Sequence, residues 1–454
     1  MGTLYQATMK HQVIQDLQVT LQDSTLIFPS EDTERKSIFL SNIDQVLNFD
    51  VQTVHFFQAN PDFPPEVVNE KLKSALGKVL VPYDFLAGRL KFNPEVGRLE
   101  INCNAAGVGF VVAHTEFSLH EIGDLVYPNP AFRKLVAKSF DSLKADDQPL
   151  FIVQVTSFKC GGFAMGVSNN HATFDGISFK LFLQNLASQA FPDKPLAAIP
   201  CNNRELLAAR SPPRVTFPHP ELLKLKIPVG QEESAAPPVF DCPEEDLDFK
   251  IFHLSSNDVA YLKDKAKGPP AGPTKITGFN VVTAHVWRCK ALSCDTGDDL
   301  SRSSTVLYAV DIRSRLCPPL PQSYTGNAVL SAYATAQCKE LEEGPFSWLV
   351  EMVTEGAARM TDEYARSAID WGEVYKGFPH GEFLISSWWR LGFDEVEYPW
   401  GKPKYSCPVV YHRRDIILLF PDIGGVKDHG VNVLVALPAK EMEKFQTLFH
   451  KFLA

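Results

Sequence analysis

The segment "SNNHATFDGISF", residues 168–179, carries an imidazole and a carboxylate four positions apart, with a glycine directly after the carboxylate. A neutral imidazole can take a proton from a hydroxyl group near neutral pH, so His171 is a candidate general base. Asp175 could bind that imidazole, or it could hold the loop by pairing with an arginine. Gly176 is expected to let the backbone turn tightly between an apolar strand and an apolar helix. The spacing therefore points to proton-transfer chemistry on a short loop.

On the motif alone, other interpretations stay open. The pattern arises by chance in roughly a few per cent of chains of this length. A histidine and an aspartate at this spacing could also ligate a metal, but no third ligand lies nearby in the sequence, so no metal is expected. A core histidine with satisfied hydrogen bonds is the third interpretation.

The composition is that of a globular chain. Its 454 residues, 45% of them hydrophobic, suffice for two domains, and the net charge of −10 without a basic cluster argues against nucleic-acid binding. No apolar run reaches the roughly 18 residues of a membrane span, and the start lacks the apolar core of a signal peptide. Nine cysteines without CxxC spacing are expected to be reduced thiols. We therefore expect a cytoplasmic protein without a membrane span.

The elements that must position His171 form two α/β sets on either side of a Pro-rich stretch, which favours mixed sheets covered by helices. Strands are expected at residues 52–60, 98–117, 249–255, 304–316, 381–393, 407–420 and 430–438, and two more within 148–170, joined near Lys159–Gly162. Helices are expected at residues 64–80, 178–191, 256–267, 277–292, 344–368 and 440–453, with Ser256 or Asn257 as the N-cap of the third. The predicted domains are 1–190 and 248–454, joined by a crossover linker at 191–247, and the segment around 385–410 is a candidate to pack with the first domain.

Short motifs occur in order along essentially the whole chain: "FLSNIDQ", "FLAGRL", "HATFDG", "AHVWRC", "VDIRSR", "YTGN" and "WGKP". This order resembles the plant BAHD acyl-CoA-dependent acyltransferases. The resemblance implies an α/β fold of two chloramphenicol-acetyltransferase-like halves that enclose a solvent channel. It also implies a monomer that takes a small-molecule acyl-CoA as substrate, releases CoA and needs no separate cofactor.

The resemblance gives roles to the first group of site residues. The family's general base corresponds to His171. The family's aspartate corresponds to Asp175 and pairs with an arginine, which the "VDIRSR" motif places at Arg313. An Asp175–Arg313 ion pair is therefore expected to hold the His171 loop, and Asp175 should matter more for folding than for proton transfer.

A second group lies on the expected strand at 381–393. Relatives that use hydroxycinnamoyl groups carry Thr-Ser-Trp here, where this chain has Ser386-Ser387-Trp388. The Ser386 hydroxyl and the Trp388 indole N–H are donors suited to the oxyanion that forms when a thioester carbonyl is attacked. Trp389, on the opposite face of the strand, is expected to fill the core.

The family's second signature, Asp-Phe-Gly-Trp-Gly, is altered to Glu397-Tyr398-Pro399-Trp400-Gly401. Pro399 has a fixed φ and no N–H, so it cannot imitate a glycine with positive φ, and the backbone path must differ. Because this loop is structural in the family, Glu397, Trp400 and Gly401 are structural candidates.

In "EYPWGKPKYSCPVVYHRRDIILLFPDI", which contains this altered signature, and in "YTGNAV" and "SFKCGGFAMGVSNNHATFDG", the chain is similar to one branch of the family, coumarin synthase. That branch converts ortho-hydroxylated hydroxycinnamoyl-CoA from trans to cis and closes it to a coumarin such as scopoletin with release of CoA. The acceptor is then the substrate's own phenol, and His171 would deprotonate it. One alternative is acyl transfer to a separate alcohol or amine. The other is a non-catalytic binding protein, against which the intact His171 argues.

Overall fold

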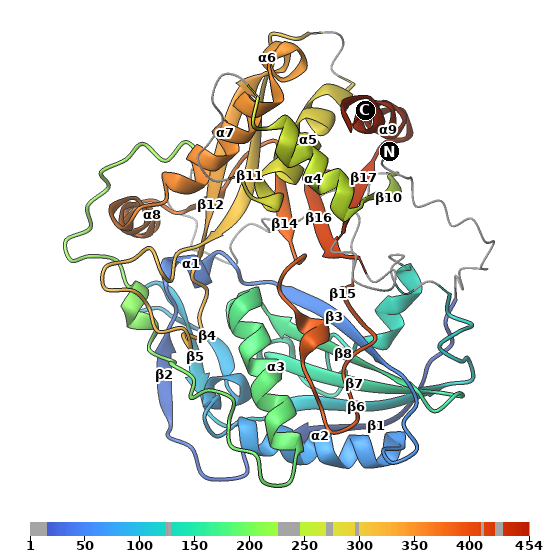
Figure 1. Ribbon diagram of the computed structural model, residues 1–454. Coiled ribbons are helices and arrows are strands. Elements are labelled where there is room, and N and C mark those ends of the chain that lie inside the picture. Colours follow the sequence, from blue (N-terminus) through green and yellow to red (C-terminus); the bar gives the residue numbers. More distant parts are fainter. Residues whose placement is uncertain are drawn as a thin grey trace.

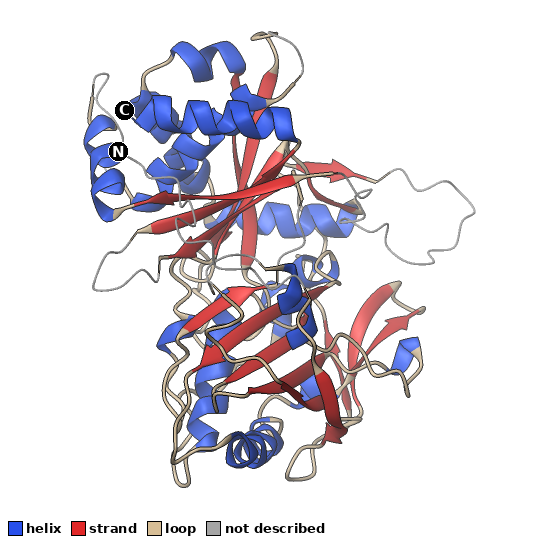
Figure 2. Ribbon diagram, turned by 90° about the vertical axis from the view of Figure 1, so that its right-hand side faces the viewer, coloured by secondary structure: helices blue, strands red, loops and turns tan. Residues whose placement is uncertain are grey.

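The described residues form two six-stranded mixed sheets, each with helices beside it (Figure 1). The computed structural model describes residues 16–123, 125, 129–225, 246–268, 276–295, 299–409, 413–422 and 430–453. Figure 2 shows the half with the second sheet above the half with the first.

The first sheet has the strand order β1-β6-β7-β8-β3-β15, and only β6 and β7 are parallel. Helices α2 (Pro65–Val79) and α3 (Gly176–Ala190) share one apolar cluster with this sheet, to which Leu72, Phe182 and Phe151 belong. The strands are β1 (Thr20–Ile27), β3 (Asp50–Phe57), β6 (Val108–Thr115), β7 (Phe151–Phe158), β8 (Phe163–Asn170) and β15 (Tyr405–Pro408).

A three-stranded sheet of order β2-β5-β4 and several short helices complete the first half. These elements are β2 (Lys36–Phe39), β4 (Arg89–Asn93), β5 (Arg98–Cys103), α1 (Asn42–Gln45), η1 (Asp84–Ala87), η2 (Pro130–Leu135) and η3 (Ala145–Asp147). After α3 the chain passes through η4 (Arg204–Leu207) to β9 (Leu222–Lys224), which pairs with β13 (Gly377–Pro379). Residues 226–245 of the predicted linker lie outside the described residues.

The second sheet has the strand order β10-β17-β16-β14-β11-β12. Strand β14 is parallel to both of its neighbours, and the other pairs are antiparallel. The strands are β10 (Asp248–Leu254), β11 (Ser303–Asp311), β12 (Val329–Gln337), β14 (Phe383–Ser387), β16 (Ile416–Pro421) and β17 (Val431–Leu437).

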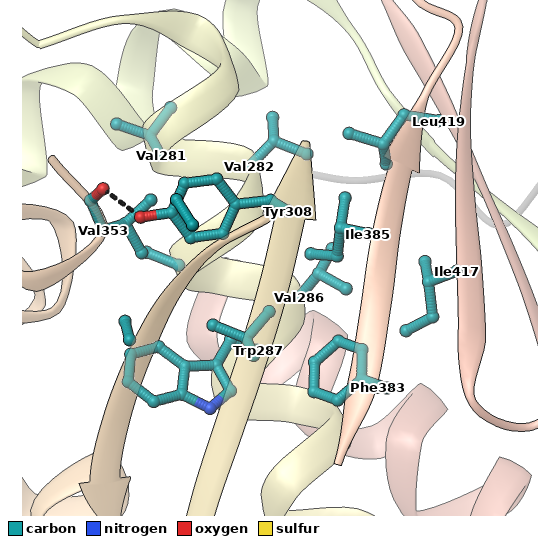
Figure 3. Close-up of a cluster of buried hydrophobic side chains, with 14 of the residues drawn as sticks. Val281, Val282, Val286, Trp287, Tyr308, Val353, Phe383, Ile385, Ile417 and Leu419 are labelled. Carbon is teal, nitrogen blue, oxygen red and sulfur yellow. Dashed lines mark hydrogen bonds between the residues drawn. The ribbon is translucent and has the colours of Figure 1, made fainter. Parts of the chain in front are cut away.

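The core of the second half lies between this sheet and α5, a helix that is buried almost all round. Figure 3 shows Val282 and Trp287 of α5 beside Tyr308 of β11 and Ile385 of β14. The Tyr308 hydroxyl donates to the carbonyl of Val353 at 2.5 Å, so this buried polar group is satisfied. The helices are α4 (Ser256–Lys265), α5 (Gly278–Ser293), α6 (Cys338–Glu343), α7 (Phe346–Ala358), α8 (Asp362–Val374) and α9 (Ala439–Leu453).

The chain crosses from the second half to the first and back between β14 and β16. The predicted strand at 381–393 ends early, at Ser387, and a turn leads into η5 (Phe393–Glu395). The predicted strand at 407–420 is wrong as one element, because β15 pairs with β3 of the first sheet and β16 with β14 and β17 of the second. This crossing brings the altered second signature into the first half (Figure 1).

Two predictions about helices are also wrong. The helix expected at 344–368 is two helices, since α7 ends at Ala358 and the Thr361 side chain caps α8 by accepting from the Tyr364 N–H. The N-cap of α4 is Ser255, not Ser256 or Asn257, because the Ser255 side chain accepts from the Asp258 N–H in a capping box.

None of the helices in the described ranges is long and apolar enough to cross a bilayer. The cysteines described by the structure are free thiols, and Cys242 lies outside the described residues.

Candidate active site

His171 directly follows β8 and begins the turn into α3. Its backbone N–H donates to the carbonyl of Phe49 at 2.8 Å, and its carbonyl accepts from Asn327 Nδ2, also at 2.8 Å. The imidazole lies beside the Phe49 ring, with 5.2 Å between the ring centroids. Because Phe49 belongs to the first half and Asn327 to the second, His171 sits at the junction of the two.

The His171 ring is half-buried. Nδ1 is enclosed and has no hydrogen-bond partner among the described residues, while the residue as a whole stays partly exposed. Burial lowers the pKa of His171 below 6.5, and contacts with its own backbone, the Asp175 carboxylate and Asn327 oppose that lowering. A neutral imidazole can accept a proton from a substrate hydroxyl.

Asp175 forms the predicted ion pair with Arg313, at 2.8 Å. The carboxylate also caps α3 by accepting from the Ser178 N–H at 2.9 Å, and it accepts from the Ala328 N–H at 2.9 Å. Burial would lower the pKa of Arg313, but Asp175 and Asp311 together raise it above its ordinary value. Asp175 thus joins the end of the His171 turn to the second half and has no bond to the imidazole in the described structure.

Gly176 has a role different from the one expected. It is the first residue of α3, and its φ is not in the left-handed region. A Cβ at this position would lie 2.7 Å from Leu391 Cδ1, which is closer than real Cβ atoms approach. Gly176 therefore lies against the Leu391 side chain of the segment after β14, which would have to shift for a larger residue, and it does not serve a left-handed turn.

Ser386 lies in the last part of β14, and Trp388 directly follows the last residue of that strand, Ser387. Both side chains are half-buried, and neither the Ser386 hydroxyl nor Trp388 Nε1 makes a hydrogen bond to the described residues. Trp388 packs against apolar clusters of both halves. Trp389 is a core residue as predicted, and its Nε1 donates to the carbonyl of Gly430 at 2.9 Å.

The altered second signature forms a tight turn inside the first half. The Gly401 N–H donates to the Tyr398 carbonyl at 3.0 Å, which places Pro399 at the second position of the turn, where its fixed φ fits. Gly401 takes the positive φ, +112°. The Tyr398 and Trp400 rings are stacked, with centroids 5.1 Å apart, and both are buried. Glu397 is exposed.

The structure adds three polar residues that sequence reasoning did not single out. Asp44 and Arg204 form an ion pair at 3.2 Å whose side chains are 0% exposed. Asn327 donates to Asp44 at 2.7 Å as well as to the His171 carbonyl. Asp44 and Asn327 lie in the motifs "FLSNIDQ" and "YTGN", so a signal for them was present, whereas Arg204 lies in none of the quoted motifs.

No cluster of three potential metal ligands exists among the residues that the structure describes. His171 offers an imidazole base tied to a set of buried ion pairs, and Ser386 and Trp388 offer two donors at the end of β14. Among the described residues no hydrogen bond or ring contact joins His171 to Ser386 or Trp388. An imidazole can move a proton, and such donors can stabilise an oxyanion.

Known proteins match this chain over nearly its whole length. The model of the Transferase family matches residues 17–451. "Acyltransferase GLAUCE" of Arabidopsis thaliana is 62% identical over 99% of both chains, and "Omega-hydroxypalmitate O-feruloyl transferase" of the same plant is 34% identical over 95% of this chain and 93% of its own. The crystal structure of vinorine synthase superposes with a TM-score of 0.72 at 24% identity, covering 94% of this chain and 96% of that chain. This likeness confirms the predicted fold of two α/β halves.

Proposed function

This chain belongs to the Transferase family of plant BAHD acyltransferases, and on that premise we propose that it moves a hydroxycinnamoyl group from coenzyme A to a hydroxyl oxygen with His171 as the general base. Support for the acyl class comes from the relative named as an O-feruloyl transferase and from the Ser-Ser-Trp sequence at 386–388.

The observation that carries the proposal is the state of His171. Its side chain is partly exposed, its backbone is fixed at the junction of the halves, and burial keeps its pKa below 6.5. At neutral pH the ring is therefore uncharged and ready to take a proton.

The reaction that follows from these groups has three steps. His171 Nε2 takes the proton of the acceptor hydroxyl while its oxygen attacks the thioester carbonyl. The oxyanion of the tetrahedral intermediate is stabilised by the Ser386 hydroxyl and Trp388 Nε1–H. The carbonyl re-forms, the carbon–sulfur bond breaks, and the CoA thiolate takes the proton back from His171.

We further propose that the acceptor is a phenol on the acyl group itself. Loss of the proton from an ortho phenol sends electrons into the side chain and gives its alkene single-bond character, so that the trans form can rotate to cis. Attack is then intramolecular, with effective molarities of about 10⁵ M and above. The products are a coumarin and CoA. This finer proposal is supported by the similarity around Glu397–Gly401 described from the sequence.

A separate alcohol is the second candidate acceptor, which is favoured by the name of the relative that acylates omega-hydroxypalmitate. The contacts of His171 do not distinguish this reaction from ring closure, because both need the same base. The presence or absence of a required second substrate separates the two.

The test uses feruloyl-CoA and 6′-hydroxyferuloyl-CoA in the dark, each with and without a long-chain alcohol, with products identified by mass spectrometry. If the enzyme catalyses ring closure, 6′-hydroxyferuloyl-CoA alone should give a coumarin and one CoA, and the coumarin should form faster than it does without enzyme. An ester formed only with the alcohol favours the second candidate. If neither thioester releases CoA under any condition, the hydroxycinnamoyl proposal is wrong.

A further inference from the structure

Asp44 is a completely buried carboxylate, and its partners bind backbone carbonyls of the turn that begins at His171. It lies in α1, where its Oδ2 accepts from the Ser41 N–H at 3.0 Å and from the Ser41 hydroxyl at 2.8 Å. These bonds fix the carboxylate in one orientation, because both belong to the same capping box. Its other oxygen is left for partners from distant parts of the chain.

That other oxygen, Oδ1, binds two residues far apart in sequence. Arg204 Nη1 lies at 3.2 Å, and Asn327 donates to the same oxygen through its backbone N–H at 3.0 Å and its Nδ2 at 2.7 Å. Arg204 comes from η4 after the first half, and Asn327 precedes β12 of the second half. One oxygen atom thus orients donors from both halves.

The same donors bind three consecutive carbonyls of the His171 turn. Asn327 Nδ2 donates to the His171 carbonyl at 2.8 Å. Arg204 Nη1 donates to the Ala172 carbonyl at 2.8 Å, and Arg204 Nη2 donates to the Thr173 carbonyl at 2.7 Å. A planar guanidinium presents its N–H groups to two neighbouring acceptors in fixed directions, whereas a lysine ammonium is a single point charge without this fork. Asp44 therefore fixes the backbone that carries the imidazole by orienting Arg204 and Asn327.

We propose that Asp44, Arg204 and Asn327 are positioning residues that aim the His171 imidazole at the acceptor hydroxyl. The inference rests on the proposed role of His171 as general base. A buried ion pair is costly to desolvate and is weak evidence for stability alone. Here its hydrogen bonds go to the carbonyls of the turn, so its effect falls on the geometry of that turn.

The neighbouring ion pair acts on the other end of the same turn. Asp175 accepts from the Ala328 N–H, and Ala328 directly follows Asn327. Arg313 donates to the carbonyl of Gly326 at 3.2 Å. Residues 326–328 therefore connect the two ion pairs, and the turn is held at its beginning by Asp44 and at its end by Asp175.

Two substitutions test this without leaving a buried charge alone. Asn327→Ala removes the Nδ2 bonds to the His171 carbonyl and to Asp44 Oδ1 and keeps the Asp44–Arg204 pair. Arg204→Lys keeps the charge and loses the fork. We expect each to lower kcat for CoA release from the accepted hydroxycinnamoyl-CoA by about 10- to 100-fold, because small misplacements of a catalytic group have effects of this size. The KM for the acyl-CoA should change less than about 3-fold.

Arg210→Lys is the matched control, since Arg210 also pairs with a buried aspartate, Asp370, at 2.6 Å and donates to a carbonyl, that of Arg214. It should leave kcat per folded molecule within about 3-fold of the unsubstituted protein. All rates are normalised to the folded fraction, measured by circular dichroism at the assay temperature.

The outcomes separate this inference from the function on which it rests. If His171→Ala keeps full activity, the proposed base is wrong. If His171→Ala abolishes activity while Asn327→Ala and Arg204→Lys both keep kcat, or if Arg210→Lys lowers kcat as much as they do, the positioning role is wrong. A rise in KM at constant kcat also overturns it, because such a change reports uniform substrate binding.

Discussion

The two signature turns of this protein are held by different forces. The turn from His171 to Asp175 is bound through hydrogen bonds and two buried ion pairs, Asp175–Arg313 and Asp44–Arg204. The turn from Glu397 to Gly401 is closed by backbone hydrogen bonds between Tyr398 and Gly401, and its side chains pack as stacked aromatic rings without an ion pair among the described residues.

The two turns also differ in whether their buried polar side chains have hydrogen-bond partners. In the second turn the Tyr398 hydroxyl and Trp400 Nε1 are buried without partners in the described structure, and Glu397 is exposed. Directional bonds fix the orientation of a reacting side chain, whereas apolar contacts fix a chain path and tolerate exchange. The comparison indicates chemistry at the first turn and support at the second.

The sharpest division is expected from His171→Ala. Loss of a general base lowers kcat by about 10²- to 10⁴-fold. The free energy of unfolding should change little, because the ring is half-buried and its Nδ1 has no partner to lose. Steady-state kinetics and urea unfolding of the same preparation measure both. His450→Ala, in α9 of the second half, is the control and should leave both unchanged.

Asp175→Asn should separate holding the turn from proton transfer. The substitution leaves Arg313 with less compensation in a buried site, and we expect a loss of about 3 kcal/mol in the free energy of unfolding. Asp311→Asn is the matched control, because Asp311 pairs with the same arginine but its side chain is 37% exposed, so its loss should cost about 0–1 kcal/mol. Equal losses for the two variants, measured by urea unfolding, would contradict the assignment.

At the second turn, Trp400→Ala should destabilise without slowing the chemistry. The indole contacts Tyr398, Phe57 and Phe163, and removing it leaves a cavity that costs about 3–5 kcal/mol. Thermal unfolding gives the stability, and kcat per folded molecule should stay within about 3-fold. A folded variant that has lost its kcat would place this turn in the active site and end the contrast.

The pH profile tests the electrostatics of the first turn. Because burial lowers the pKa of His171, the base stays neutral to a pH below 6.5, and kcat/KM should fall only below that shifted value, about tenfold per pH unit. The stability of the protein should change with pH in the same direction as kcat/KM. The unfolded chain binds this proton first, so the contribution of His171 to the unfolding free energy falls as pH drops through 6.5. An acid limb above pH 6.5 in kcat/KM would contradict the assignment.

A long-range ion pair was predictable only where the family resemblance assigned both of its partners. The His171–Asp175 spacing and the resemblance carried by "VDIRSR" gave the pair with Arg313, which the structure contains. Arg204 could not be found because its partners lie 160 residues before it and 31 and 32 residues before it, and no periodicity links them.

Element boundaries show the same limit. Thr361 followed by Asp362 and Glu363 is a capping signal that separates α7 from α8, so that break was readable. Strand β12 was not expected, since its alanines at 332, 334 and 336 favour strands weakly. The crossing of β15 into the first sheet depends on pairing with β3, and nothing in its own residues indicates the partner.

The smallest effects come from the backbone of the second turn, where Gly401→Ala and Pro399→Ala form a matched pair. A Cβ at Gly401 meets no atom within 4 Å, so the φ of +112° alone is tested, and a strained residue there costs of order 1–3 kcal/mol. Alanine can take the φ of Pro399, so Pro399→Ala should cost only about 0.4–1 kcal/mol, through the greater freedom of the unfolded chain. Urea unfolding ranks them. If Pro399→Ala lowered the free energy of unfolding more than Gly401→Ala, Pro399 would be a main source of the stability of this turn. The altered signature would then stabilise the segment and would not be merely a tolerated exchange.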